Sequence, residues 1–256
     1  MFELIRKFSL FMLLFIVGLS TYLSGESSTD WRAPLNVRVY PISGDGLPST
    51  DEYIRSLSSS DFTTIESFMQ TEAERFRVSL KQPVKIELGA RLRELPPMPP
   101  QSANPISVAF WSLKIRWWSN SINSEPADEH ADIKLFLVYF DPNVTPTLKH
   151  SVGLRKGLLG IVNVFADQAQ TDTNSFVTAH EMLHTLGASD KYGGPNNLPI
   201  HPDGYADPER TPLYPQSAAE VMGGRIPLTP SEAVIPNSLA DARIGAATAV
   251  EIRWLR

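Results

Sequence analysis

The sequence contains no cysteine in its 256 residues. This absence excludes disulfide frameworks, thiol nucleophiles, cysteine-ligated zinc and iron–sulfur clusters. Histidine is also scarce, with 5 residues, so any metal site must combine these few imidazoles with carboxylates. The 23 lysine and arginine residues are outnumbered by 28 aspartate and glutamate residues, which gives a net charge of −5. Because nucleic-acid binding needs a basic surface, we expect no nucleic-acid partner.

Residues 1–25 have the pattern of an export signal. A positive flank precedes an uncharged apolar run over residues 10–19, and small polar residues follow. The segment is either a signal peptide, cleaved after Ser20 or less favourably after Gly25, or a signal anchor that tethers the protein to a membrane through residues 8–23. In both cases we expect the rest of the chain to be exported, to the periplasm or out of the cell.

The residues that follow predict a strand–helix–strand unit. Apolar and polar side chains alternate over residues 35–41 and 84–88, which indicates two strands, the first ending at its proline. Apolar residues at helical spacing predict a helix between them, which begins at Ser60 or Asp61 and runs to Leu80. Because a helix connects the two strands, we expect them to pair in parallel.

Residues 105–118 allow two interpretations. The side chains from Trp111 to Trp117 alternate as in a strand. A parallel sheet, however, needs a second crossover helix at this point of the chain, and Pro105 suits the first turn of a helix. We therefore expect a helix over residues 105–118.

Two apolar runs, residues 133–140 and 158–165, predict buried strands, with a short edge strand between them around residues 148–154. A helix is expected over residues 175–186. The prediction is an α/β (α+β) fold with a mixed, mostly parallel twisted sheet and crossover helices, in which residues 30–187 form the N-terminal subdomain.

Residues 188–256 predict a smaller, irregular subdomain. Nine of the 21 prolines of the chain fall between Pro195 and Pro236, and proline disfavours long helices and central strands. A capping-box pattern that opens at Ser238 predicts a final helix, which continues to Val250.

His180 and His184 are the chemically informative residues of the chain. They stand four positions apart, so on a helix both lie on one face and can reach one zinc ion. Glu181 directly follows the first histidine and is placed to address a water on the metal instead of the metal itself. This spacing predicts a Zn²⁺ site with Glu181 as its catalytic group.

Gly187 and Asp190 extend the motif. Gly187 lets the chain leave the helix in a left-handed conformation, after which Asp190 can return to the site as a third ligand. Each residue also has a plainer interpretation, Gly187 as a helix cap and Asp190 as a turn residue. We expect His180, His184 and Asp190 to bind the metal.

The segment HEMLHTLGASD, residues 180–190, resembles the zinc-binding consensus of the metzincin clan of metallopeptidases, in which the third ligand is usually histidine. Aspartate in that place is similar to the variant of the snapalysin group. The resemblance implies a Met-turn beneath the metal, and residues 220–225 fit it with Met222 as the methionine, although Met222 could also be an ordinary core residue. Several metzincins carry a tyrosine where Gly224 stands here. The remaining candidates for stabilising a transition state are Tyr192, Tyr205, Tyr214 and Arg225.

These residues predict a zinc metalloendopeptidase, a hydrolase acting on a protein or peptide substrate. Glu181 would be the general base toward a zinc-activated water and would then pass the proton to the leaving amine. We expect an extended substrate to pair with an exposed sheet edge above the metal.

Other assignments stay open. In a thermolysin-like arrangement, Glu209 or Glu220 would be the third ligand. His201 is a further candidate ligand, and its loop could contribute Asp203 to a calcium site. The non-enzyme alternative is an exported protein with structural zinc or a partner-binding role, although a structural site needs a fourth protein ligand and has no need of Glu181.

Overall fold

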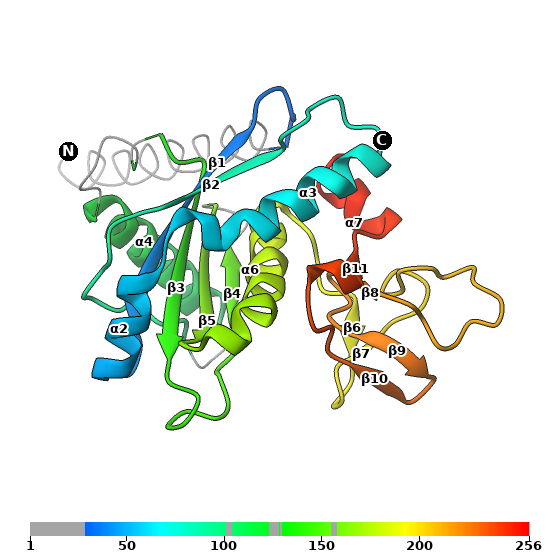
Figure 1. Ribbon diagram of the computed structural model, residues 1–256. Helices are drawn as coiled ribbons and strands as arrows, with labels where there is room; N and C mark the ends of the chain where they lie inside the picture. Colours follow the sequence, from blue (N-terminus) through cyan, green and yellow to red (C-terminus); the bar gives the residue numbers. More distant parts are fainter. Residues whose placement is uncertain (1–28, 101–103, 123–127, 129, 155–157, 256) are drawn as a thin grey trace.

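A five-stranded sheet forms the centre of the protein (Figure 1). The computed structural model describes residues 29–255 apart from 101–103, 123–127, 129 and 155–157. The strands in spatial order are β2 (Val84–Leu88), β1 (Leu35–Ser43), β3 (Ile133–Phe140), β5 (Leu159–Phe165) and β4 (Val152–Leu154). The first four run parallel, and β4 pairs antiparallel with β5 at the edge. The predicted α/β fold with a mixed, mostly parallel sheet is confirmed.

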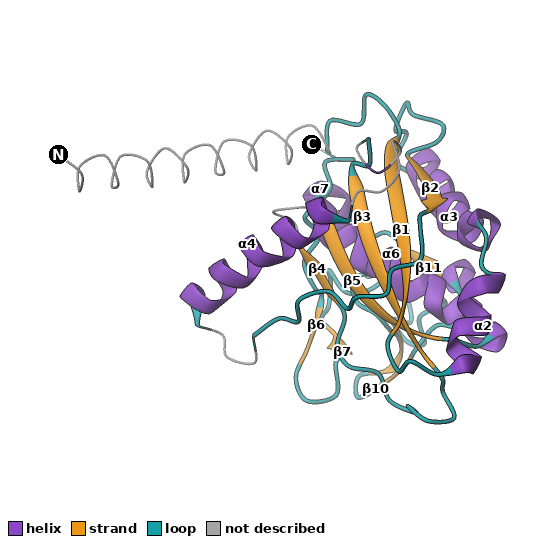
Figure 2. Ribbon diagram, turned by 90° about the vertical axis from the view of Figure 1, so that its left-hand side faces the viewer, coloured by secondary structure: helices purple, strands orange, loops and turns teal. Residues whose placement is uncertain are grey.

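Helices cover both faces of this sheet (Figures 1 and 2). The helices and short 3-10 turns of this part are α2 (Pro48–Ser56), η1 (Ser59–Phe62), α3 (Thr63–Arg75), α4 (Pro105–Ser121), η3 (Gln168–Gln170) and α6 (Thr171–Leu186). Side chains alternate along β1: Val37 and Val39 join the larger core with α3 and α6, whereas Tyr40 and Ile42 join a second core with α4. Each face of the sheet therefore has its own core.

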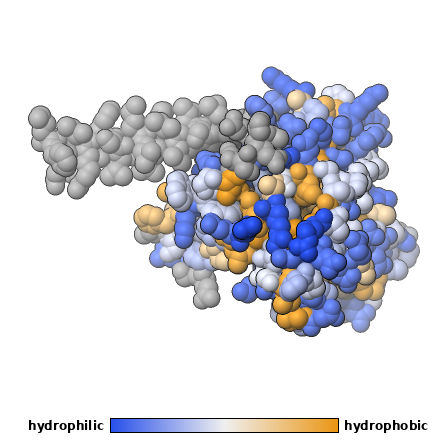
Figure 3. All heavy atoms as spheres, turned by 60° about the vertical axis from the view of Figure 1, so that its left-hand side comes forward, coloured by the Kyte–Doolittle hydropathy of each residue, from blue (hydrophilic) through white to orange (hydrophobic). Residues whose placement is uncertain are grey.

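The helix predicted over residues 105–118 is present as α4. Trp111, Ile115 and Trp118 are buried against the sheet at helical spacing. On the other side of the helix, Phe110 is 70% and Trp117 73% exposed. Figure 3 turns this side of the molecule forward and shows apolar side chains at the surface among polar ones. The strand-like alternation arises because apolar residues stand on both sides of the helix.

The first crossover differs from the prediction in two ways. The sequence pattern does not indicate α2, because this short helix is mostly polar and Ile54 is its one buried apolar residue. The helix expected to run to Leu80 ends at Arg75. Arg77 takes a left-handed φ of 58°, and the N–H of Val78 donates to the carbonyl of Ala73, which closes the helix.

The strands lie close to their predicted positions. β2 and β3 have the predicted bounds, β5 begins one residue later than expected, and the edge strand expected around residues 148–154 is shorter, at Val152–Leu154. β1 continues beyond Pro41 to Ser43. The proline is tolerated because the pairing of β1 with β2 ends at Val39, so the ladder needs no N–H donor from Pro41 on that side.

The segment after α6 contains short elements. They are β6 (Tyr192–Gly193), β7 (Leu198–Pro199), β8 (Ala219–Glu220), β9 (Ile226–Thr229), β10 (Glu232–Val234), η4 (Leu239–Asp241), β11 (Ala242–Arg243) and α7 (Ala246–Glu251). The final helix predicted from Ser238 begins only at Ala246. Ser238 caps the single turn η4, and β11 then pairs with β8, which prevents a continuous helix. This segment packs on α3 and α6 in the larger core, to which it contributes Val221, Met222 and Trp254.

The predicted export segment, residues 1–25 with the tether at 8–23, lies outside the described residues. Within residues 29–255, the described helices are all too short or too polar to cross a membrane.

Candidate metal centre

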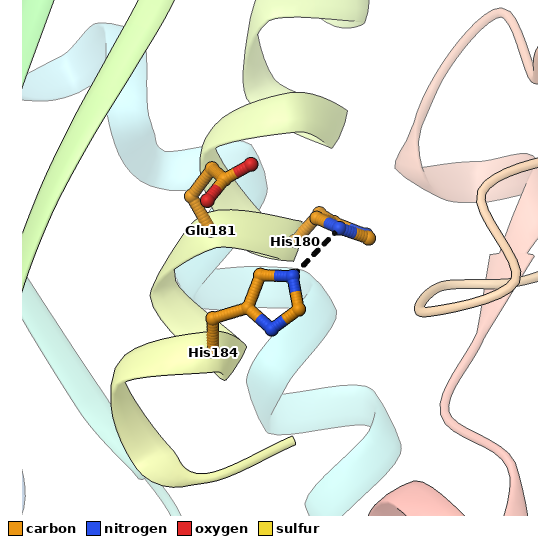
Figure 4. Close-up of side chains that lie close together, drawn as sticks. All are labelled: His180, Glu181 and His184. Atoms are coloured by element: carbon orange, nitrogen blue, oxygen red, sulfur yellow. Dashed lines mark hydrogen bonds between the residues drawn. The ribbon is translucent and has the colours of Figure 1, made fainter. Parts of the chain in front are cut away.

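Helix α6 carries His180, Glu181 and His184 (Figure 4). It begins at Thr171, four residues before the predicted start, because Asp167 caps the turn η3 that leads into it. It ends at Gly187, whose φ of 107° is left-handed and favours glycine. This cap turns the chain back toward the histidines.

His180, His184 and Asp190 meet at one point. The Nε2 atoms of His180 and His184 lie 3.1 Å apart. Oδ1 of Asp190 lies 3.2 Å from Nε2 of His180 and 3.1 Å from Nε2 of His184. The histidine side chains are 10% and 17% exposed, whereas that of Asp190 is 44% exposed. The cluster therefore opens to solvent on the Asp190 side.

The other ring nitrogen of each histidine fixes the tautomer. Nδ1 of His180 lies 2.9 Å from the carbonyl oxygen of Val221, and Nδ1 of His184 lies 2.8 Å from that of Ala188. A carbonyl oxygen only accepts, so each Nδ1 carries the hydrogen and each neutral ring presents an electron pair at Nε2. Two such electron pairs and the Asp190 carboxylate converge, an arrangement that a cation stabilises.

The carboxylates of Glu181 and Asp190 both lie near the histidines, and their distances from the Nε2 atoms indicate which one can bind a metal. Ligand atoms of His180, Glu181 and His184 all lie within 4.8 Å of one another. Tetrahedral zinc with ligands at about 2.0–2.1 Å requires ligand atoms about 3.3 Å apart. The distances of 3.1 to 3.2 Å that join both Nε2 atoms to each other and to Asp190 are close to this spacing. The donor set with Asp190 fits zinc, and Glu181 lies beside it.

Glu181 is a buried carboxylate with an unpartnered oxygen. The residue is 7% exposed, and its Oε2 has no hydrogen-bond partner within the described part of the chain. Burial raises the pKa of this carboxyl, an effect that the nearby imidazoles and the backbone of Gly153 oppose only in part. Such a group is suited to accept a proton and release it again.

The charges of the cluster favour a positive partner. Burial raises the pKa of Asp190. When the imidazoles also carry a proton on Nε2, their hydrogen bonds to the carboxylate outweigh burial and hold the pKa of Asp190 below its usual range. Burial lowers the pKa of His184, but hydrogen bonds with Asp190 and the Ala188 carbonyl outweigh it and raise that pKa. The site thus attracts positive charge through its own carboxylates.

The four candidates for transition-state stabilisation lie in different places. The ring of Tyr192 stacks on His180 with centroids 6.2 Å apart. Burial, followed by the charge of Asp190 and a hydrogen bond with it, raises the pKa of Tyr192 to about 12. The hydroxyls of Tyr205 and Tyr214 instead contact each other at 2.6 Å, and Arg225 follows the turn that ends at Gly224. Of the four candidates, Tyr192 is the one that lies beside His180 and Asp190.

Residues 220–225, where the resemblance implies a Met-turn, form a tight turn beside helix α6. The carbonyl of Glu220 accepts hydrogen bonds from the N–H groups of Gly223 and Gly224, and Gly224 has a left-handed φ of 72°. Met222 is fully buried in the larger core. The carbonyl of its neighbour Val221 accepts from His180, as described above. The carbonyl of Met222 accepts from the N–H of Lys191, which is next to Asp190. The turn therefore contacts both the helix and the segment of the third candidate ligand.

The alternative ligands are engaged elsewhere or exposed. The buried carboxylate of Glu220 accepts from the N–H of Gly223 at 2.8 Å, the N–H of Gly245 at 2.9 Å and the hydroxyl of Thr248 at 2.6 Å. Burial still raises its pKa. His201 places Nε2 at 3.1 Å from the carbonyl of Pro208. Asp203 and Glu209 lie at the surface, as do the two remaining histidines, His130 and His150.

The sequence does not indicate that the backbone carbonyls of Val221 and Ala188 orient the two histidines. It also does not indicate the contact of Gly153 with helix α6. A residue motif gives no signal for a backbone carbonyl supplied from 41 positions away. A comparison with models of known protein families finds no match, and neither does a comparison with curated proteins.

Proposed function

We propose that the protein is a zinc-dependent metalloendopeptidase. The observation that carries the proposal is the convergence of two Nε2 electron pairs and one carboxylate oxygen within 3.2 Å, beside a buried and unpartnered carboxylate. His180, His184 and Asp190 would hold the zinc. When bound, zinc supplies a Lewis acid that acidifies a coordinated water and polarises a substrate carbonyl.

Glu181 moves the proton in this proposal. Its Oε2 accepts a proton from the attacking water and then donates it to the amine nitrogen that leaves the cleaved peptide bond. Structural zinc sites close with four protein ligands, whereas catalytic sites use three and keep a position open. Three donors with a separate buried carboxylate support the catalytic class.

The edge strand β4 supports an extended peptide as substrate. β4 pairs with β5 on one side and ends the sheet on the other. It also lies against α6, since Gly153 is in contact with Glu181 and His184. A peptide that adds to this edge as a further strand would pass beside the proposed metal ligands.

The test is a comparison of wild type with Glu181→Gln, and with Glu209→Gln as a matched control on the surface. All three proteins are loaded with zinc, their metal content is measured, and cleavage of casein and of a peptide library is followed. We expect Glu181→Gln to bind one zinc per chain and to lose about 10²- to 10⁴-fold in kcat, because general acid–base catalysis contributes this much. Glu209→Gln should behave as wild type.

Two results contradict the proposal. One is a wild-type protein that binds zinc and cleaves no peptide, which would indicate a structural or partner-binding metal. The other is a Glu181→Gln variant that retains full activity.

A further inference from the structure

Ser189 and Lys191, the residues on either side of Asp190, share one partner. Glu251 of α7 accepts a hydrogen bond from the backbone N–H of Ser189 at 3.0 Å and another from the Ser189 hydroxyl. Its Oε2 also forms a 2.6 Å ion pair with the Lys191 ammonium, whose side chain is only 5% exposed. One carboxylate thus contacts both the residue before the third candidate ligand and the residue after it.

Helix α7 is itself fixed at its other end. Glu220, at the base of the Met-turn, accepts from the N–H of Gly245 and the hydroxyl of Thr248. The same carboxylate accepts from the N–H of Gly223 in the turn. One end of α7 is therefore joined to the turn behind His180, and Glu251 at the other end is joined to the segment of Asp190.

Asp190 needs such support because its own side chain is 44% exposed. The described contacts of its carboxylate are with His180, His184 and Tyr192, which belong to the site itself. The position of the carboxylate relative to the helix therefore depends on the backbone that carries it. Glu251 holds this backbone directly at Ser189, and on the other side it holds the chain through the Lys191 side chain.

We infer that Glu251 is a positioning residue, which holds Asp190 at the proposed metal through Ser189 and Lys191. This inference rests on the proposed function. Residues that orient a metal ligand from outside typically change metal affinity by about 10- to 100-fold when they are removed. Loss of Glu251 should weaken zinc binding although Glu251 does not contact the metal.

The experiment measures the zinc dissociation constant of the full chain, by competition with a chelating dye, for wild type, Glu251→Ala and Glu251→Gln. Glu232→Ala, which removes an exposed glutamate of β10, is the matched control. We expect the dissociation constant to rise about 10- to 100-fold in Glu251→Ala. The rise should be smaller in Glu251→Gln, because the amide oxygen can still accept from Ser189. Glu232→Ala should leave the value unchanged.

Two further readouts separate positioning from folding. Urea unfolding of the zinc-free proteins reports the stability of the fold, and the visible absorption of Co²⁺ bound in place of zinc reports ligand geometry. A changed Co²⁺ spectrum in the folded Glu251→Gln protein supports positioning. If the folded Glu251→Ala and Glu251→Gln proteins both keep the wild-type zinc affinity and Co²⁺ spectrum, Glu251 does not position Asp190, whatever its effect on stability.

The outcomes also distinguish the two proposals. A wild-type protein that binds no zinc overturns the proposed function together with this inference. A wild-type protein that binds zinc and cleaves peptides, with Glu251 variants that bind zinc equally well, overturns the positioning role alone.

Discussion

At the scale of single residues, Asp45 joins three elements through one carboxylate. Its Oδ1 accepts from the N–H of Leu47 at 3.0 Å, and its Oδ2 accepts from the N–H of Asp141 at 2.7 Å and the hydroxyl of Thr50 at 3.0 Å. These groups stand after β1, at the start of α2 and after β3. Burial raises the pKa of Asp45, but the hydrogen bonds outweigh it and lower the pKa below its ordinary value of 3.8.

Replacement Asp45→Asn should destabilise the protein by about 2 kcal/mol at pH 7, since hydrogen bonds to a charged acceptor are lost. The folded carboxyl has the lower pKa, so its stabilisation is complete above the ordinary value and disappears as pH falls through the folded value. The difference in unfolding free energy between wild type and variant should therefore shrink below about pH 4. Urea titrations between pH 7 and 3 measure it, with exposed Asp203→Asn as control. A difference independent of pH would contradict this role.

The candidate site was predictable to the extent that it is local in sequence. The spacing of His180, His184 and Asp190 is set by one helix and its glycine cap, so a short motif contains the geometry. The partners that hold these residues come from distant parts of the chain. Glu251 stands 62 positions from Ser189, and no pattern within either segment indicates that they meet.

At the scale of elements, the contact between β4 and α6 depends on Gly153. A Cβ at this position would lie 2.4 Å from Cβ of His184 and 2.6 Å from the carbonyl oxygen of Glu181, closer than side chains approach. Absence of a side chain lets the edge strand lie directly on the helix turn that carries both residues.

Replacement Gly153→Val should push β4 away from α6 while leaving His180 and His184 on their helix. Under the proposed function, we expect peptide hydrolysis to fall by at least about tenfold, because displacement of the proposed binding edge disturbs the orientation of the substrate. Zinc content should stay at the wild-type level. Leu154→Ala on the same strand serves as control, with activity and metal content measured in parallel. Unchanged hydrolysis in Gly153→Val would exclude β4 as the substrate edge.

The elements themselves differ in how far the sequence predicts them. β2 and β3 were predictable because alternation or a continuous apolar run marks a strand directly. The crossover from β1 to β2 was less predictable. Helix α2 has too few apolar residues to produce a helical pattern, and the end of α3 depends on the left-handed conformation of Arg77, which composition does not indicate. The expected final helix failed because pairing of β11 with β8 overrides a local capping pattern.

At the scale of the whole molecule, the first and last described parts of the chain close one core. The rings of Trp31 and Trp254 lie 5.4 Å apart, and Trp254 also contacts Phe76 of the first crossover at 6.1 Å. The indole N–H of Trp31 donates to the carbonyl of Ile252 at 2.7 Å. The sheet and the irregular segment after α6 therefore share buried side chains, and we expect them to unfold together.

Replacement Trp254→Ala should lower the free energy of unfolding by about 3–5 kcal/mol, because it removes a large buried side chain. Trp117→Ala is a matched control: its side chain is 73% exposed, and exposed substitutions typically change stability by no more than about 0.5 kcal/mol. Urea unfolding followed by both circular dichroism and fluorescence measures the two variants. Separate transitions for the two probes in wild type would show that the parts do not share one cooperative core.

The link from Asp190 to α7 has a consequence for the order in which the protein matures. A chain made from its N-terminal end presents both histidines and Glu181 well before Glu251 exists. Under the proposed function, a nascent chain would bind zinc weakly and spare neighbouring proteins until α7 has been made and has docked. Zinc affinity measured on nascent chains stalled before and after α7 should increase at this step.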